Sequence, residues 1–505
     1  MIDPTSNEFQ LGVVGAGAMG QGIAQVALQG GMNVLLHDAR DGGAEAGIDA
    51  VLKRLSRLVE KGQITPADRA AMQARIKHVG TLAHLAGCNL IVEAVFEDLA
   101  LKQGIFAELE THVADDCVLA SNTSSLLIAS IARACKRPQR VAGLHFFNPV
   151  PLMKLVEVIR GPQTSDDVIA FLTECGTRMG RTPVTVKDAP GFLVNFGGRA
   201  YTTEAMRILH ERVATPAQID AVMRDCCHFR MGPCELMDLT GVDVNYPVSR
   251  IVYKGYDDDP RLKTSFPHKS LLESGQLGRK TGRGNYAYDD HGKIIDAPSP
   301  DYTPPAGTVS ATSIVLIEPR NGMERFAEEL GLNVLKSDDG KSPIVGEPQG
   351  EDCTAFAVRT GVDYRRLVAV DLANGMRPRV TIMTAPGADP EPRDQIAQAI
   401  ISAGSKVTLI KDSPGFIAPR LCAMIANLGC EMAQIGIAEP KQIDLAMRLG
   451  LNYPLGPLEI AEEMRLPRLL QILQNMQALT GEDRYRPSMW LRRRAQLGLS
   501  IFTPD

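Results

Sequence analysis

Short apolar runs recur along the first part of the chain and alternate with segments in which apolar residues have helical spacing. Such runs are typical of parallel strands that are buried on both faces, and the segments between them are typical of the connecting helices. The pattern predicts an open, parallel α/β sheet that extends to about residue 187. The predicted strands are Leu11–Val14, Val34–Leu36, Leu90–Val95, Val118–Ala120, Val141–Leu144 and Leu155–Val158.

The first predicted strand leads into a glycine turn formed by Gly15, Gly17 and Gly20, and the second strand ends at Asp38. A GxGxxG turn between a strand and a helix lets the backbone approach a pyrophosphate at the helix N-terminus. An acid at the end of the second strand can accept hydrogen bonds from a ribose and repels a 2′-phosphate. The turn therefore predicts dinucleotide binding and favours NAD over NADP, although FAD shares the glycine pattern.

Composition narrows the class of protein. A chain of 505 residues is too long for one hydrophobic core, so two to four domains are expected. The formal net charge of -5 argues against nucleic acid as a partner. Ten cysteines occur without zinc-type spacing, which favours free thiols in a reducing cytoplasm and no metal site. No apolar run is long enough for a membrane span, and the N-terminus does not have the pattern of a signal peptide.

His145 follows an apolar strand at the edge where open α/β sheets place their ligands. Glu157 lies twelve residues later, near the end of the neighbouring strand, so the two side chains can meet. A neutral imidazole suits removal of a hydroxyl proton, and a carboxylate can fix its tautomer. Taken alone, a histidine at the end of a strand is more often a structural residue.

Several segments resemble the 3-hydroxyacyl-CoA dehydrogenase family over roughly the first 290 residues: IVEAVFEDLALKQGIF (91–106), LASNTSSLL (119–127), GLHFFNPVPLMKLVEVI (143–159), KDAPGFLVN (187–195) and GRKTGRGNY (278–286). The resemblance implies an NAD-binding Rossmann domain and a helical domain. It also implies oxidation of an (S)-3-hydroxyacyl-CoA to a 3-oxoacyl-CoA, with His145 as base and Glu157 as the residue that orients it.

The resemblance assigns further site residues. Ser124 would bond the substrate oxygen or the nicotinamide ribose, and Asn195 would hold a substrate oxygen. The alternatives are that Ser124 caps a helix and that Asn195 is merely a polar residue in a helix's first turns. The positions that match residues lining the cofactor are Met19, Glu97, Lys102 and Asn148.

Two charged sets have a plainer alternative reading. Glu97 and Lys102 could be solvated helix charges. A helical segment also carries basic residues that could hold the phosphates of CoA or simply form a solvated face. These residues are Lys53, Arg54, Arg57 and Lys61, of which Lys61 is the predicted substrate contact.

The sequence repeats itself at an offset of 224 residues. KDAPGF at 187–192 returns as KDSPGF at 411–416, and the match continues through the following helical segment. The predicted organisation is a Rossmann domain (1–187), a helical domain (188–296), a linker with a degenerate Rossmann-like domain (297–410) and a second helical domain (411–505). In single-copy relatives the helical domain forms the dimer contact, so the repeat suggests a pseudo-dimer within one chain, with further homo-oligomerisation left open.

The second half has no counterpart of the catalytic pair. Its first strand, SIVLIEPRNG, lacks GxGxxG, and all nine histidines lie at or before His291. At the constant offset, His145 would correspond to Ala369, Glu157 to Thr381 and Asn195 to Pro419. One active site per chain is expected.

The two-copy form resembles enzymes of bacterial phenylacetate breakdown, which makes 3-hydroxyadipyl-CoA a candidate substrate. The rival candidate is 3-hydroxybutanoyl-CoA, and the family resemblance in general implies fatty-acid metabolism and β-oxidation. Two other functions stay open at this point. One is an NAD-dependent dehydrogenase of a free sugar acid, and the other is a nucleotide-binding structural protein without turnover.

Overall fold

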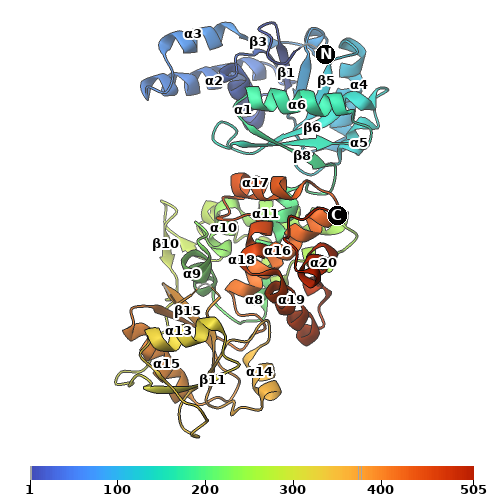
Figure 1. The fold of residues 1–505 in the computed structure, drawn as a ribbon. Coiled ribbons are helices and arrows are strands. Elements are labelled where there is room, and N and C mark those ends of the chain that lie inside the picture. The colour runs from blue at the N-terminus through green and yellow to red at the C-terminus, as the bar shows by residue number, and fades with distance from the viewer. Residues whose placement is uncertain (1–2, 374, 377) are drawn as a thin grey trace. The chain divides into compact units, whose positions relative to one another are not determined.

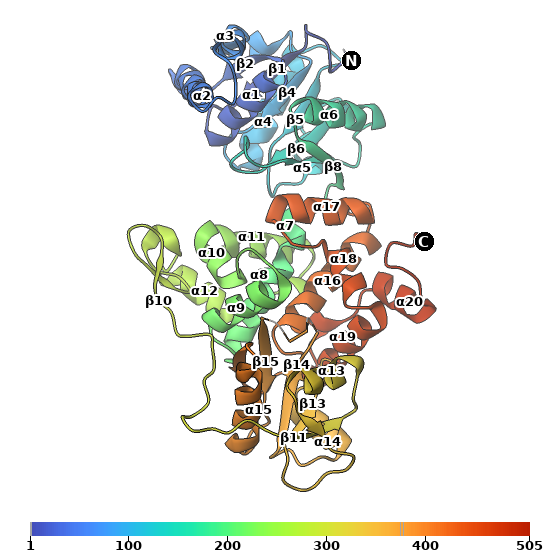
Figure 2. The same ribbon diagram turned by 60° about the vertical axis from the view of Figure 1, so that its left-hand side comes forward.

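The computed structural model describes residues 3–373, 375, 376 and 378–505, which form two compact units (Figures 1 and 2). The first comprises Met1–Phe196 together with Ile435–Leu451, and the second comprises Gly197–Gln434 together with Asn452–Asp505. A short piece of the second half of the chain is therefore part of the first unit. None of the helices among the described residues is long and apolar enough to cross a membrane.

The first unit contains an eight-stranded sheet in the order β3-β2-β1-β4-β5-β6-β7-β8. Every neighbouring pair is parallel except β6 and β7, which run antiparallel. The sheet is thus not parallel throughout, contrary to the prediction from the sequence, and the antiparallel strands β6 and β7 carry the candidate residues His145 and Glu157. The strands are β1 (Gln10–Val14), β2 (Asn33–His37), β3 (Ile76–Val79), β4 (Leu90–Glu93), β5 (Val118–Ser121), β6 (Val141–Phe146), β7 (Leu155–Arg160) and β8 (Thr182–Lys187).

Helices lie on both faces of this sheet, as the Rossmann prediction requires (Figure 1). The core consists of alternating strand residues and the apolar faces of α1 and α6, with Val13, Leu36 and Leu144 fully buried. The helices are α1 (Ala18–Gln29), α2 (Gly43–Glu60), α3 (Pro66–Ala74), α4 (Leu99–His112), α5 (Ile128–Ala132), α6 (Asp166–Arg178) and α7 (Val194–Gly197), with 3₁₀ turns η1 (Leu82–Leu85) and η2 (Pro138–Arg140).

Helix α17 (Pro440–Leu451) comes from the second helical repeat but packs on β7 and β8 of the first unit. The N–H of Lys187 donates to the carbonyl of Ile437 at 2.8 Å, which joins the segment to the end of β8. The 224-residue counterpart of this bond exists in the second unit, where the N–H of Lys411 donates to the carbonyl of Val213 at 3.1 Å. Each half therefore donates one segment to the sheet of the other half.

The second unit contains a smaller sheet in the order β12-β11-β13-β14-β15-β16, with β14 antiparallel to β15 and the other pairs parallel. This is the degenerate Rossmann-like region expected from the sequence. Its strands are β11 (Ser313–Ile317), β12 (Asn333–Val334), β13 (Ile344–Gly346), β14 (Leu367–Asp371), β15 (Arg379–Met383) and β16 (Lys406–Ile410), and its helices are α13 (Asn321–Glu329), α14 (Cys353–Thr360) and α15 (Pro390–Ser402).

Two sets of helices complete the second unit. The first repeat supplies α8 (Arg199–His210), α9 (Pro216–Cys227), α10 (Pro233–Thr240), α11 (Val242–Gly255), η3 (Pro260–Leu262), α12 (Phe266–Glu273) and η4 (Arg279–Thr281), followed by a hairpin of β9 (Ala287–Tyr288) and β10 (Ile294–Asp296). The second repeat supplies α16 (Ala418–Gln434), α18 (Pro457–Glu463), α19 (Leu466–Thr480), η5 (Asp483–Tyr485) and α20 (Met489–Leu497).

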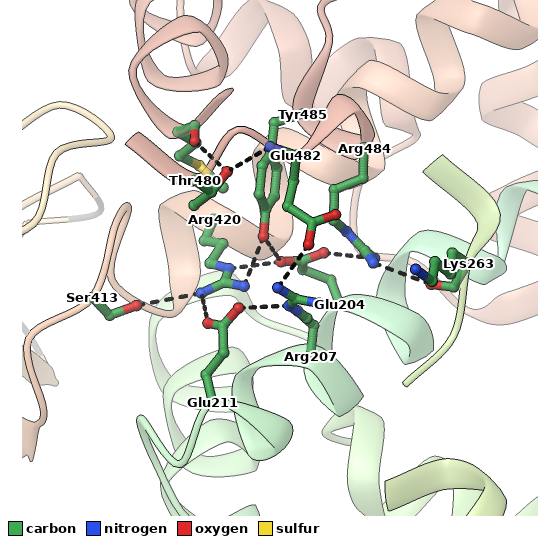
Figure 3. Close-up of polar contacts among 11 residues, drawn as sticks. Glu204, Arg207, Glu211, Lys263, Ser413, Arg420, Thr480, Glu482, Arg484 and Tyr485 are labelled. Atoms are coloured by element: carbon green, nitrogen blue, oxygen red, sulfur yellow. Dashed lines mark hydrogen bonds and ion pairs between the residues drawn. The ribbon is translucent and has the colours of Figure 1, made fainter. Parts of the chain in front are cut away.

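The two helical repeats join where α8 packs against α16 (Figures 1 and 2). A buried polar cluster crosses this junction (Figure 3). The Glu204 carboxylate of α8 accepts from Arg420 Nε at 2.6 Å and from the Tyr485 hydroxyl at 2.9 Å, and Arg484 Nη2 lies 2.9 Å away. Because Glu204 and both arginines are almost fully buried, their charges must compensate one another. The cluster fixes how the repeats fit together.

The repeat extends to hydrogen-bond detail. Asp188 accepts from the N–H groups of Ile128 and Ala129 at the start of α5. Its counterpart Asp412 accepts from the N–H groups of Cys353 and Thr354 at the start of α14. Both carboxylates stabilise a helix N-terminus.

One sequence correspondence was wrong. In β14 and β15, Asp371 stands opposite Thr381, as His145 stands opposite Glu157 in β6 and β7. Asp371, and not Ala369, therefore occupies the position of His145. The constant offset fails because the connection between the two strands is two residues shorter in the second half than in the first.

Candidate active site

His145 and Glu157 form a directly cross-strand pair. They stand opposite each other on β6 and β7, and His145 Nδ1 lies 2.6 Å from Glu157 Oε2. Both side chains are buried, at 6% and 0% exposed. A carboxylate at Nδ1 favours the tautomer in which Nδ1–H donates to Glu157 and Nε2 stays available as an acceptor. The ring of Phe147 lies 4.5 Å from the imidazole and that of Phe192 lies 5.9 Å away.

Glu157 is held by the backbone that leads into α7. Its Oε1 accepts from the N–H groups of Leu193 at 3.2 Å and Val194 at 2.9 Å. The turn before them has Phe192 at a φ of 48°, a left-handed conformation that aims the following amides at the carboxylate. Two N–H donors on one oxygen stabilise the ionised form of Glu157 and leave its other oxygen for the imidazole.

Ser124 and Asn195 lie together. The Asn195 amide donates to the Ser124 carbonyl at 3.3 Å. Ser124 does not cap a helix, since α5 begins four residues later with Leu127 at its N-cap. Asn195 does lie in the first turn of α7, and its side chain also reaches the loop of Ser124.

The Ser124 loop is bound to the Glu97 carboxylate. Oε1 of Glu97 accepts from the Thr123 hydroxyl at 2.6 Å and from the N–H groups of Ser124 and Ser125 at 2.9 and 3.0 Å. Burial raises the pKa of Glu97, but the Thr123 hydroxyl and the charge of Lys102 outweigh it, so the net pKa is lowered. Glu97 stays charged and holds the loop in place.

Lys102 is not the solvated helix charge of the alternative reading, because its side chain is 1% exposed. Its ammonium donates to Glu93 Oε1 at 2.6 Å and lies 3.4 Å from Glu97 Oε2. Glu93 also accepts from the Ser121 hydroxyl at 2.6 Å. The sequence reading missed Glu93, a fully buried carboxylate at the end of an apolar strand; a lone acid in such a strand is the signal that could have found it.

The glycine turn leaves room for a dinucleotide. A Cβ at Gly17 would meet nothing within 4 Å, and no side chain caps the N-terminus of the twelve-residue helix α1. A Cβ at Gly20 would lie 1.8 Å from the carbonyl oxygen of Gly15, which itself has a φ of 104°. Gly15 and Gly20 are therefore needed for the turn itself. The uncapped N–H groups at the start of α1 suit the binding of a pyrophosphate.

Asp38 lies at the end of β2 beside this turn. It accepts from the N–H of Ala16 at 2.8 Å and from Arg40 Nε at 2.8 Å. The Arg40 guanidinium holds the pKa of the Asp38 carboxyl well below its usual range. A fixed negative charge therefore stands where the adenosine ribose of a bound dinucleotide would lie.

The remaining predicted positions are more dispersed. Met19 lies on α1, partly buried against the core, and Asn148 is exposed in the loop after β6. Among the basic residues of α2, Arg54 donates to Gln25 and Gln21 of α1 and is therefore engaged inside the unit. The exposed ones are Lys53, Arg57 and, at the C-cap, Lys61.

Comparison with known proteins decides the class. Residues 10–189 match the 3-hydroxyacyl-CoA dehydrogenase NAD-binding domain, and residues 191–288 and 415–500 match the C-terminal domain of the same family. The chain belongs to the 3-hydroxyacyl-CoA dehydrogenase family. It is an NAD-dependent 3-hydroxyacyl-CoA dehydrogenase, as the resemblance implied, which rules out the sugar-acid and non-catalytic readings.

This dehydrogenase is similar over its whole length to a 3-hydroxyadipyl-CoA dehydrogenase of Escherichia coli, with 36% identity over 97% of the chain and 98% of the relative. A crystal structure of a 3-hydroxybutyryl-CoA dehydrogenase from Escherichia coli matches with a TM-score of 0.86 and 36% identity, over 97% of this chain and 99% of that one. A probable 3-hydroxybutyryl-CoA dehydrogenase of Deinococcus radiodurans is 40% identical over 55% of this chain and all of its own length. That single-copy relative matches little more than half of this chain.

Proposed function

We propose that His145 is the general base for oxidation of the 3-hydroxyl group, and that Glu157 orients it. The observation that carries this proposal is the 2.6 Å contact between Nδ1 and the carboxylate, inside a buried pair. With Nδ1 protonated toward Glu157, Nε2 has the lone pair needed to accept the hydroxyl proton. The carboxylate then stabilises the imidazolium, while the two N–H groups on Oε1 keep it ionised.

The surrounding residues prepare the substrate and the cofactor for this step. NAD, when bound, supplies the hydride acceptor. Gly15, Gly17, Gly20 and Asp38 would hold its pyrophosphate and adenosine ribose. The nicotinamide end would lie near Met19, Glu97, Lys102 and Asn148, as the family resemblance implies. Ser124 and Asn195, joined at 3.3 Å, would bind the oxygen atoms of an (S)-3-hydroxyacyl group.

Two substitutions test the pair. His145→Gln should lower kcat by roughly the 10²–10⁴ attributed to general acid–base catalysis, with the Kd for NADH unchanged. Glu157→Gln should also lower kcat and should shift the pH dependence of kcat, because the imidazolium loses its counter-charge. Stopped-flow kinetics measure kcat and its pH dependence, and fluorescence titration measures the Kd for NADH. Unchanged turnover in His145→Gln would remove His145 from this role.

We further propose that the acyl group carries a terminal carboxylate, as in 3-hydroxyadipyl-CoA. The support is the full-length similarity to a relative of that name, with both repeats present. The rival substrate is 3-hydroxybutyryl-CoA, the name carried by the other full-length match. The test compares kcat/KM for 3-hydroxyadipyl-CoA, 3-hydroxyhexanoyl-CoA and 3-hydroxybutyryl-CoA. A higher value for the hexanoyl than for the adipyl thioester would contradict the proposal.

The CoA phosphates would bind the exposed cations of α2. Lys53, Arg57 and Lys61 follow one another at intervals of four residues and therefore share a face of the helix. Lys61→Gln should raise the KM for the CoA thioester more than kcat changes, and Arg54→Gln serves as a comparison because Arg54 is bonded to α1.

We propose that the duplicated half makes the chain a pseudo-dimer. Helix α16 is buried along almost its whole length, and its Arg420 bonds Glu204 of the first repeat. Deletion of residues 301–505 should therefore expose the apolar face of α8 and cause aggregation or self-association, measurable by light scattering. A truncated protein that stays soluble, monomeric and fully active would overturn the proposal. The proposal includes the division of the chain into four domains, with the ranges 1–187, 188–296, 297–410 and 411–505.

The site of action we propose is the cytoplasm. No disulfide joins any of the ten cysteines, and six of them are buried, which suits a reducing compartment. Fractionation of cells that express the full chain would test this directly.

A further inference from the structure

The second half contains a polar constellation at the place that corresponds to the catalytic site, although the residue types differ. Asp371 stands opposite Thr381 as His145 stands opposite Glu157. The neighbouring strand extends the match. Gly346 of β13 pairs with Ala369 in the same way as Ser121 of β5 pairs with Gly143. Gln349 lies three residues after Gly346, as Ser124 lies three residues after Ser121, so Gln349 takes the position of Ser124. The position of Asn195 is taken by Pro419.

An arginine organises this constellation. Arg468, from α19, donates through Nε to Gln349 Oε1 at 2.6 Å and through Nη2 to Glu347 Oε1 at 2.9 Å. Glu347 and Gln349 are 7% and 3% exposed, so these contacts are buried. Nη1 of Arg468 has no hydrogen bond to any residue that the structure describes, and it keeps two N–H donors. The guanidinium is therefore held in place with one donor end open.

A cavity of about 280 Å³ lies beside this arginine. Its interior wall is apolar and includes Phe229, Ala418, Pro419 and Ile460, all of which are buried or partly buried. Arg468 lies in this wall, and the exposed residues of the lining include His228, Leu455 and Glu463. A pocket with an apolar body and one oriented guanidinium has the character of a small-molecule site.

The buried acids nearby do not cancel the charge of Arg468 completely. Burial raises the pKa of Asp371 to about 7, with a smaller effect from the charge of Glu347. Burial also raises the pKa of Glu347, although Arg468 opposes this shift. A carboxyl group that takes up a proton near neutral pH leaves the local charge more favourable to an anion. The second half contributes no histidine to the cavity wall, and the one histidine in the lining is His228 of the first repeat, which is exposed.

We propose that this cavity is a second, non-catalytic binding site for a small carboxylic acid with an aliphatic or aromatic body. The carboxylate would accept from Nη1 of Arg468, and the body would lie against Phe229, Pro419 and Ile460. An ionised carboxylate on an arginine forms one of the stronger hydrogen bonds available in proteins. Glu463 at the mouth opposes the same charge, so its removal should strengthen binding.

Hexanoate is the probe, and the full-length protein is used. Isothermal titration or ligand-observed NMR should show saturable binding of hexanoate, and much weaker binding of hexanamide, which has the same body without the charge. The titration is run with NAD⁺ and acetoacetyl-CoA at saturation, two oxidised reactants between which no hydride can pass, so that the catalytic site stays filled, and it is repeated without them. Arg468→Met should weaken hexanoate binding at least about tenfold, and Glu463→Gln should tighten it a few-fold.

A second variant guards against a folding defect, since Arg468→Met leaves Glu347 unpaired. Leu455→Trp places a large ring at the exposed mouth of the cavity without touching the charges, and it should also weaken hexanoate binding. Both variants should keep the parent's NADH oxidation rate. The proposal is overturned if the parent does not bind hexanoate, if hexanamide binds equally well, if both variants bind hexanoate as the parent does, or if acetoacetyl-CoA displaces it.

Discussion

Gly450 lies directly against Val194, although the two residues belong to opposite halves of the sequence. A Cβ at Gly450 would be 3.1 Å from Val194 Cγ2 and 3.0 Å from Leu155 Cδ2. The N–H of Val194 donates to Glu157 at 2.9 Å. Helix α17 of the second repeat thus supports the backbone that holds the proposed orienting carboxylate.

We therefore expect Gly450→Val to impair turnover. The added methyl groups must push Val194 or Leu155 aside, an overpacking that typically costs about 1–3 kcal/mol. Displacement of the Val194 amide would loosen Glu157 and then His145, so kcat should fall about tenfold or more, since small misplacements are costly in catalysis. Steady-state kinetics measure kcat, and fluorescence titration should show an unchanged Kd for NADH.

The matched control is Gly87→Val, because a Cβ at Gly87 would meet nothing within 4 Å. It should leave kcat unaffected. If Gly450→Val also leaves kcat unaffected while the protein remains folded, α17 has no part in positioning Glu157.

A second prediction concerns the choice of cofactor. Asp38 carries the fixed negative charge beside the glycine turn, and Arg40 is paired to it at 2.8 Å. Asp38→Asn removes the repulsion toward a 2′-phosphate and releases a guanidinium that can bind it. The ratio of kcat/KM for NADPH to that for NADH should rise at least about tenfold, which corresponds to about 1.4 kcal/mol.

Asp41→Asn is the control for this change, since it removes one exposed charge three residues away. It should leave the cofactor ratio as it is in the parent. An unchanged ratio in Asp38→Asn would show that other residues determine the preference for NAD.

The sequence predicted those parts of the site whose residues lie close together along the chain. The glycine turn and Asp38 belong to one βαβ unit, and His145 and Glu157 lie within one short segment, so the sequence predicted that each set lies close together. The sequence did not reveal strand direction or the contacts between distant segments. The antiparallel direction of β7 was not predicted, although it is what places His145 opposite Glu157.

Two further features of the structure could not be predicted from the sequence, for physical reasons. A constant offset cannot follow a loop whose length changes, which is why Asp371 was overlooked in favour of Ala369. The packing of α17 on β7 and β8 joins residues more than 200 positions apart, and no local pattern encodes such a contact. The repeat itself was visible because its helical part is collinear.

A third prediction concerns Glu93, which holds Lys102 at 2.6 Å and Ser121 at 2.6 Å. Glu93→Gln removes the closest charge from a buried ammonium, and breaking such a pair costs about 3–5 kcal/mol. Glu97, at 3.4 Å, compensates in part by shifting toward Lys102, which disturbs the Ser124 loop. We expect a lower free energy of unfolding and a weaker affinity for NADH.

Denaturant titration and NADH fluorescence measure these two quantities. Glu108→Gln, an exposed change on the same helix as Lys102, should alter neither. Parent-like stability and NADH affinity in Glu93→Gln would show that Glu97 alone is enough to hold Lys102.

The last prediction concerns the buried cluster of Figure 3. Glu204→Gln leaves Arg420 and Arg484 with one carboxylate fewer inside the junction of α8 and α16, so the free energy of unfolding should fall by about 3–5 kcal/mol. Glu211→Gln removes a charge that also contacts Arg420, at 2.7 Å, but this side chain is partly exposed and its loss should cost clearly less.

The effect should depend on pH in a defined direction. Burial raises the pKa of Glu204, but Arg484 and Arg420 outweigh it, so the folded-state pKa lies below the ordinary value of 4.5. An acid with a lowered pKa stabilises the folded state above its unfolded pKa and loses that contribution as the pH falls through the folded one. The difference in unfolding free energy between the parent and Glu204→Gln should thus be constant near pH 7 and shrink below about pH 4.5. A difference that grows on acidification would mean that the ionised carboxylate is not what stabilises the junction.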